Sequence, residues 1–122
     1  MRRAFGLVVL LVAAFSGAAG AARPLVIYCS HDADACELAA QTFERETGVN
    51  ASIIRKPTGE FYAQIRAERE NPRADVWYGG TIEPFLQAAA EGLFTPYRSP
   101  RMAELQPWAR KATERAEHKV AA

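Results

Sequence analysis

Short apolar runs alternate three times with longer segments of helical periodicity, and this alternation limits the possible folds sharply. Each apolar run ends in small or polar residues that open the next helical segment. The junctions span residues 28–31, 56–60 and 78–81. A βαβαβα order favours a parallel sheet with helices on both faces, because crossover connections are right-handed. The turns after parallel strands lie at one edge of the sheet, where open α/β folds bind ligands.

The residue patterns also predict where the elements lie. Strands are expected over residues 25–28, 50–56 and 75–78, and helices over residues 33–47, 59–70 and 82–91. We predict an α/β fold of three layers, with strand order 2-1-3 and the ligand edge between strands 1 and 3.

The first helix illustrates the pattern. Its apolar side is expected to carry Ala35, Leu38, Ala39, Thr42 and Phe43, which recur at i, i+3 and i+4 spacing. Asp32 or Ser30 is expected to cap its N-terminus. Gly48 stands where a helix ends in the left-handed conformation.

The N-terminus has the pattern of an export signal. A basic start at Arg2 and Arg3 is followed by an apolar run over residues 4–15, too short to span a bilayer. Residues 19–21 read Ala-Gly-Ala and fit a cleavage site. We therefore predict a signal peptide over residues 1–21 and a periplasmic location for a mature chain that starts near Ala22.

Composition and motifs exclude several function classes. The chain has 15 Lys and Arg against 14 Asp and Glu and no basic block, so nucleic-acid binding has no electrostatic basis. No phosphate-binding loop, dinucleotide fingerprint, nucleophile elbow or zinc spacing occurs. We expect no catalytic residues, no metal site and no cofactor.

The two cysteines leave three possibilities open. Export places Cys29 and Cys36 in an oxidising compartment, where a cysteine pair usually forms a disulfide. Two separate buried thiols or a redox pair are the alternatives. The C-x6-C spacing gives little support to redox catalysis, which typically uses C-x-x-C.

The three junctions supply the candidate ligand-binding residues. They are Ser30, His31, Thr58, Gly59, Gly80 and Thr81. Hydroxyl groups, glycine backbone and the N–H groups of helix N-termini suit a small anion. Each junction can also be an ordinary helix cap or tight turn. His118, in the polar C-terminal segment, is expected to be exposed. One of Trp77 and Tyr78 is expected to face the helical layer, since strand side chains alternate. Core packing is expected for both, and the alternative is that the second one lines the cleft.

Five segments in order resemble one family. They are residues 25–30 (LVIYCS), 43–49 (FERETGV), 58–60 (TGE), 74–80 (ADVWYGG) and 91–97 (EGLFTPY). The chain is similar to class II periplasmic substrate-binding proteins of ABC transporters, in the branch that binds ferric iron, phosphonates and sugar phosphates. The resemblance runs from Leu25 to Trp108.

The resemblance implies a protein of two lobes that closes on a solute and delivers it to a membrane permease. Here it covers an N-terminal lobe over residues 22–108, half of a periplasmic-binding-protein fold, with a polar, frayed helical tail over residues 109–122. Family members are much longer, so the chain is expected to be a truncated product or a fragment.

The resemblance also bears on the solute. Some iron-binding members place a glutamate after the third strand, where this chain has Gly79, Gly80 and Thr81. The expected solute is therefore a phosphate ester or phosphonate, or ferric iron held together with an anion, bound by a monomer. The alternatives are a small exported redox or hydrolytic enzyme using Cys29, Cys36 and His31, or an inactive fragment.

Overall fold

The structure, a computed structural model, describes residues 22–120, and the predicted signal peptide lies outside them. The elements are β1 (Leu25–Cys29), α1 (Ala33–Thr47), β2 (Ala51–Arg55), α2 (Thr58–Ala67), β3 (Val76–Tyr78), α3 (Ile82–Ala90), a 3₁₀ turn (Met102–Glu104) and α4 (Pro107–Arg115). The predicted strand–helix alternation is confirmed. The second helix ends three residues earlier than predicted.

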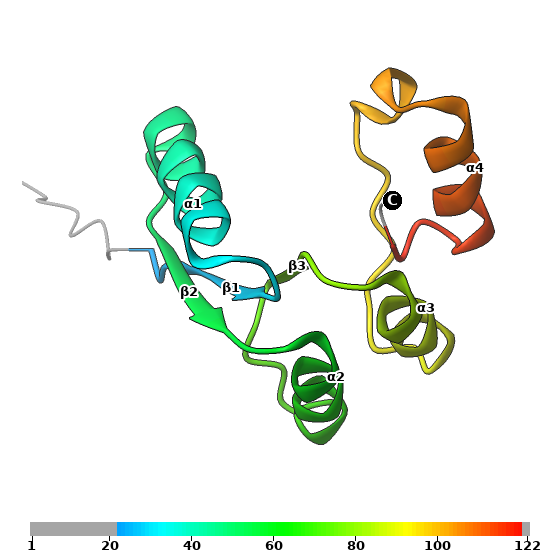
Figure 1. The fold of residues 1–122 in the computed structure, drawn as a ribbon, viewed down its shortest axis with the longest axis horizontal. Helices are drawn as coiled ribbons and strands as arrows, with labels where there is room; N and C mark the ends of the chain where they lie inside the picture. Colours follow the sequence, from blue (N-terminus) through cyan, green and yellow to red (C-terminus); the bar gives the residue numbers. More distant parts are fainter. Residues whose placement is uncertain (1–21, 121–122) are drawn as a thin grey trace, which may run out of the picture.

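The strands form one parallel sheet in the predicted order β2-β1-β3. In the pairing register, Ile27 of β1 lies opposite Ile53 of β2 and Val76 of β3. Figure 1 shows α1 on one side of the strands and α2 on the other. This arrangement confirms the three-layer α/β fold and brings the turns after all three strands to one edge of the sheet.

Two neighbouring residues of β1 tie the central strand to both helical layers. Tyr28 and Cys29 are each only 1% exposed. The Tyr28 ring stacks on Phe61 of α2, with 4.4 Å between centroids. Cys29, which points to the opposite face, forms a disulfide with Cys36 of α1. Burial on both faces explains why β1 is a continuous apolar run.

The buried Tyr28 hydroxyl is satisfied by two side chains of α2 and the turn that follows it. It donates to the Glu68 carboxylate, 2.9 Å from Oε2, and accepts a hydrogen bond from Gln64 Nε2 at 2.7 Å. Burial and the hydrogen bond to Glu68 raise the pKa of Tyr28. Because both hydrogen bonds are made, the Tyr28 hydroxyl can be buried between the sheet and α2 without an unsatisfied polar group.

Helix α1 is rotated relative to the sequence prediction. Its buried residues are Cys36 and Ala40, whereas Leu38, predicted to pack, is 65% exposed. The disulfide to β1 explains the difference, because it fixes the Cys36 face of the helix against the sheet. Asp32 occupies the N-cap without a side-chain cap bond, and Gly48 ends the helix at φ +72°, as predicted.

Aromatic packing attaches α3 to β3. Trp77 stacks on Phe85 of α3 with 3.9 Å between ring centroids, and Phe94 lies 6.0 Å from the same indole. Tyr78, on the other face, is 44% exposed. The expected inward side chain is Trp77, whereas the expected core packing of Tyr78 is wrong, because strand alternation turns this ring away from Phe85 and leaves it exposed.

The C-terminal segment folds back on itself beside α3 (Figure 1). The N–H of Tyr97 donates to the carbonyl of His118 at 2.9 Å, and Ala109, Thr113 and Val120 are buried. His118 is half-buried rather than exposed as predicted. Helix α4 crosses the expected end of the lobe at Trp108, and the division into domains stays a prediction.

An ion pair fastens the segment just before β1 to the residue just before β3. Arg23 donates from both guanidinium NH₂ groups to Asp75, at 2.6 and 2.8 Å, and the Val26 N–H donates to Asp75 Oδ2 at 2.9 Å. These two partners hold the pKa of Asp75 below its usual value. The pair aligns β1 with β3 ahead of the ligand edge.

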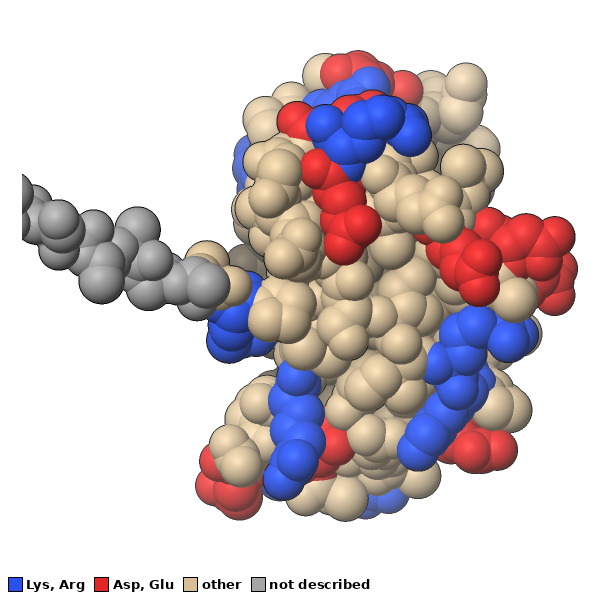
Figure 2. Space-filling view, turned by 90° about the vertical axis from the view of Figure 1, so that its left-hand side faces the viewer, with Lys and Arg blue, Asp and Glu red and all other residues tan. Residues whose placement is uncertain are grey.

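The surface carries both signs of charge. Figure 2 shows Lys and Arg side chains interspersed with Asp and Glu on the face it displays, in keeping with a formal net charge of +1. Among residues 22–120, no helix has the length and apolar character needed to span a membrane.

Candidate functional site

The turns after β1, β2 and β3 meet at Gly80. A methyl group added to this glycine would lie 3.0 Å from both Ser30 Cβ and Thr58 Cγ2, and still closer to Thr58 Oγ1. Gly80 has φ +99°, a conformation that side-chain-bearing residues rarely adopt. A glycine is therefore required for the three turns to approach this closely.

The turns are also joined through their backbones. The Ser30 N–H donates to the Tyr78 carbonyl at 2.8 Å, and the Lys56 N–H lies 3.4 Å from the Cys29 carbonyl that it faces. A methyl group added to Gly79 would lie 3.1 Å from His31 Cβ, so the His31 turn lies close against this glycine. The sheet ladder thus extends into the turns and fixes their relative positions.

A shallow pocket opens at this junction. It is lined by Ser30, His31, Asp32, Arg55, Lys56, Pro57, Thr58 and Gly80. Four of the six predicted ligand-binding residues are among them. Gly59 lies in the first turn of α2 with open space around it, and Thr81 is the exposed N-cap of α3. The structure does not bring Gly59 or Thr81 into the pocket.

The Ser30 hydroxyl is oriented by the neighbouring strand. Trp77 Nε1 donates to Ser30 Oγ at 3.2 Å, and the indole is itself held by its stack on Phe85. Because Oγ accepts this bond, the hydroxyl proton of Ser30 stays available as a donor. Ser30 can therefore donate a hydrogen bond to an acceptor in the pocket.

His31 is held by its own turn. Its Nδ1 accepts the Asp32 N–H at 2.8 Å, so a neutral ring carries its proton on Nε2. The side chain is 49% exposed. His31 can thus present an N–H donor at the rim of the pocket.

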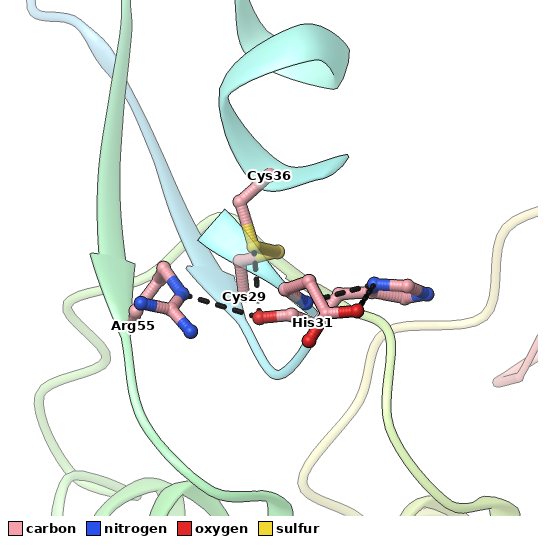
Figure 3. A network of polar contacts seen from close by, with 5 residues as sticks. Cys29, His31, Cys36 and Arg55 are labelled. Carbon is pink, nitrogen blue, oxygen red and sulfur yellow. Dashed lines mark hydrogen bonds and ion pairs between the residues drawn. A yellow bond between two sulfur atoms is a disulfide. The ribbon is translucent and has the colours of Figure 1, made fainter. Parts of the chain in front are cut away.

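Two cations that the sequence analysis did not single out also line the pocket. Arg55 ends β2, and its Nε donates to the His31 carbonyl at 3.1 Å (Figure 3). Lys56 follows it, and its Nζ donates to Gln64 Oε1 at 2.8 Å. The signal that could have revealed them is a basic pair directly before Pro57 and the predicted helix start.

The disulfide supports the same turn. Figure 3 shows Cys29 and Cys36 bridged next to the loop that carries His31, and Cys36 Sγ lies 3.6 Å from the His31 carbonyl. Both cysteines are buried, at 1% and 0% exposure. A redox enzyme would need an accessible thiol, whereas this bridge is enclosed and positions the turn.

Most of the polar groups that line the pocket are hydrogen-bond donors or cations, and one, Asp32, is a carboxylate. Two hydroxyls, a ring N–H, a guanidinium and an ammonium converge beside the N-terminus of α2, whose free N–H groups and dipole favour negative charge. Within residues 22–120, no three His, Cys, Asp or Glu side chains lie close enough together to hold a metal ion.

Comparison with known proteins gives the family. The profile of the bacterial extracellular solute-binding protein family matches residues 25–120. The chain belongs to this family. The resemblance of the five segments to periplasmic substrate-binding proteins is thereby confirmed, and the match includes α4, beyond the predicted end of the lobe at Trp108.

Solved structures of solute-binding proteins agree. The periplasmic binding protein AfuA from Actinobacillus pleuropneumoniae, with exogenous fructose-6-phosphate bound, is 48% identical with a TM-score of 0.70, over 71% of this chain and 27% of AfuA. The periplasmic binding protein P5PA is 40% identical with a TM-score of 0.71, over 76% of this chain and 30% of P5PA. Iron-bound HitA from Pseudomonas aeruginosa is 26% identical with a TM-score of 0.66, over 70% of this chain and 28% of HitA.

A curated relative extends the comparison. An uncharacterized protein of Haemophilus influenzae is 44% identical over 92 residues, which are 75% of this chain and 27% of that protein. The chain thus spans between a quarter and a third of the length of these relatives.

Proposed function

We propose that this solute-binding chain is the N-terminal lobe of the extracytoplasmic component of an ABC importer and that it binds a small phosphate ester or phosphonate. The observation that carries the proposal is the convergence of Ser30, Thr58 and Gly80 beside Arg55. It places hydroxyl donors, a helix N-terminus and a guanidinium around one pocket. Phosphate oxygens are acceptors that suit all three kinds of donor.

Each group has a distinct part in the proposed binding. Ser30 and Thr58 donate hydroxyl protons, and Thr58 is also the first residue of α2, whose N-terminal dipole favours an anion. Arg55 has its Nε committed to the His31 carbonyl, which leaves the terminal NH₂ groups for the anion. Lys56 adds positive charge at the rim. The disulfide and the Trp77 hydrogen bond hold these groups in place before the ligand arrives.

The relatives support an anionic solute in different degrees. AfuA, at 48% identity, is known with fructose-6-phosphate bound, whereas HitA, known with iron bound, is 26% identical. By analogy with AfuA, we expect this chain to bind a phosphate ester. It also includes export to the periplasm through residues 1–21, action as a monomer, and delivery of the solute to a membrane permease.

The test is calorimetric titration of the chain with inorganic phosphate, glucose 6-phosphate, 2-aminoethylphosphonate and ferric citrate. We expect the phosphorus anions to bind in the titration. In a separate thermal unfolding experiment, the unfolding midpoint should rise with their concentration, because a ligand that binds the native state stabilises it. Thr58→Val, which removes the hydroxyl and keeps the shape, and Arg55→Gln are each expected to weaken binding about tenfold or more.

The matched control is Arg115→Gln, which removes an exposed arginine from α4, outside the pocket. Its affinity for phosphate is expected to equal that of the unchanged chain. Binding of ferric citrate with no response to any phosphorus anion would contradict the proposal in favour of iron. If Arg55→Gln and Arg115→Gln weaken phosphate binding equally, Arg55 contributes only through the net charge of the chain.

A further inference from the structure

Two exposed aromatic rings lie next to each other beside the anion pocket: His31 lines this pocket, and Tyr78 lies against His31. The His31 and Tyr78 rings are nearly parallel, with an interplanar angle of 18° and 6.4 Å between centroids. The His31 side chain is 49% exposed and Tyr78 is 44% exposed. Gly79 makes their proximity possible, because its lack of a side chain lets the His31 turn lie against the end of β3.

The position of Tyr78 relative to the pocket is fixed by the backbone. Its carbonyl accepts the Ser30 N–H at 2.8 Å, whereas the Ser30 hydroxyl accepts from the Trp77 side chain. The Tyr78 ring therefore stands on the other face of the strand from that hydroxyl, and it adjoins the pocket through the His31 ring. Trp77, the preceding residue, is turned to the opposite face and packs on Phe85. The exposure of Tyr78 therefore follows from strand alternation and is not a local distortion.

A second, more apolar pocket begins where the anion pocket ends. Gly80 lines both, and the second pocket continues along Tyr78, Gly79, Ile82 and Phe85. Ile82 is 43% exposed. A ligand whose anionic end occupies the first pocket would have its organic part directed over Gly80 toward this apolar surface and the two rings.

We propose that Tyr78, with His31, binds the organic part of the ligand and selects phosphate esters that carry a ring with a flat apolar face. This inference rests on the proposed function of the anion pocket. Aromatic faces stack favourably on flat rings and offer little to a short hydroxylated chain. The phosphate would then supply attraction, and the rings would distinguish one phosphate ester from another.

The test compares two phosphate monoesters of equal charge, phenyl phosphate and glycerol 3-phosphate, with inorganic phosphate as reference. The unchanged chain is expected to bind phenyl phosphate about three- to tenfold more tightly than glycerol 3-phosphate. Tyr78→Ser should abolish this preference and leave the affinity for inorganic phosphate unchanged. Tyr78→Phe keeps the ring and should keep the preference. Trp108→Ala, which removes an exposed aromatic that lines neither pocket, should also keep it.

A measurement on the unchanged chain does not depend on how the variants fold. Nuclear Overhauser contacts are expected between the ring protons of phenyl phosphate and those of Tyr78. Equal affinities for the two esters, or no such contacts, would overturn the assignment of Tyr78 while phosphate binding still stood. Failure of every probe, inorganic phosphate included, would overturn the proposed function and this inference with it.

Discussion

Replacing Gly80 with alanine tests whether close packing of the three turns builds the site. The new methyl group would lie 3.0 Å from Ser30 Cβ and Thr58 Cγ2 and closer to Thr58 Oγ1. Because Thr58 is branched at Cβ, rotation about χ1 exchanges one heavy atom for another and does not clear the space. The backbone at φ +99° adds strain for any residue with a side chain.

The expected magnitude has two parts. Positive φ costs a side-chain-bearing residue about 1–2 kcal/mol, and overpacking costs a further 1–3 kcal/mol or so. We expect Gly80→Ala to lower the free energy of unfolding by about 2–5 kcal/mol. Gly92→Ala is the matched control. That residue also has positive φ, at +72°, but nothing lies within 4 Å of its added methyl group, so only the first part applies.

The assay is urea unfolding followed by tryptophan fluorescence and circular dichroism, with phosphate titration of each folded variant. Adding Thr58→Ser to Gly80→Ala removes one of the crowded atoms and should recover part of the lost stability, since contacting sites couple. Phosphate affinity should fall in Gly80→Ala and stay unchanged in Gly92→Ala. Equal losses of stability in the two alanine variants would refute the argument that the turns pack through Gly80.

Three further predictions concern the supports of the site. Replacing Cys29 and Cys36 together by alanine should lower the free energy of unfolding by about 2–3 kcal/mol. Urea unfolding of the variant and of the unchanged chain, each with and without reductant, measures this difference. The depressed pKa of Asp75 contributes stability that is present above its usual pKa and lost as pH falls through the lower, folded-state value. Asp75→Asn should therefore lower stability at neutral pH and flatten the decline measured below about pH 4. Trp77→Phe keeps a stacked ring but loses the donor to Ser30, so calorimetry should show phosphate affinity reduced several-fold. Unchanged affinity would show that this hydrogen bond does not orient the hydroxyl.

The order of elements and the meeting of the turns could be predicted because both follow from local patterns and chain handedness. Apolar runs of strand length, separated by helical periodicity, leave few topologies once crossovers are right-handed. The glycines at the third junction are expected to let a ligand lie against the backbone, whereas the atoms packed against Gly80 belong to Ser30 and Thr58. Whether these residues bind a ligand stays a prediction.

Other features depend on how particular elements pack against each other. Leu38 belongs to a helical apolar pattern, yet the face of α1 that packs is set by the Cys29–Cys36 bridge. Arg55 resembles an ordinary charged residue at a strand end until the His31 carbonyl is seen to accept from it. In the same way, the half-burial of His118 follows from the return of the C-terminal segment, which no local pattern indicates.

The central place of β1 has a consequence for how the sheet comes apart. Within the described residues, β2 and β3 pair only with β1 and not with each other. Detachment of β1 therefore removes every interstrand hydrogen bond at once, and the sheet has no partly paired remainder. Amide protons of β2 and β3 that bond to β1 should exchange with solvent deuterium at one common rate under native conditions, as members of a single cooperative unit.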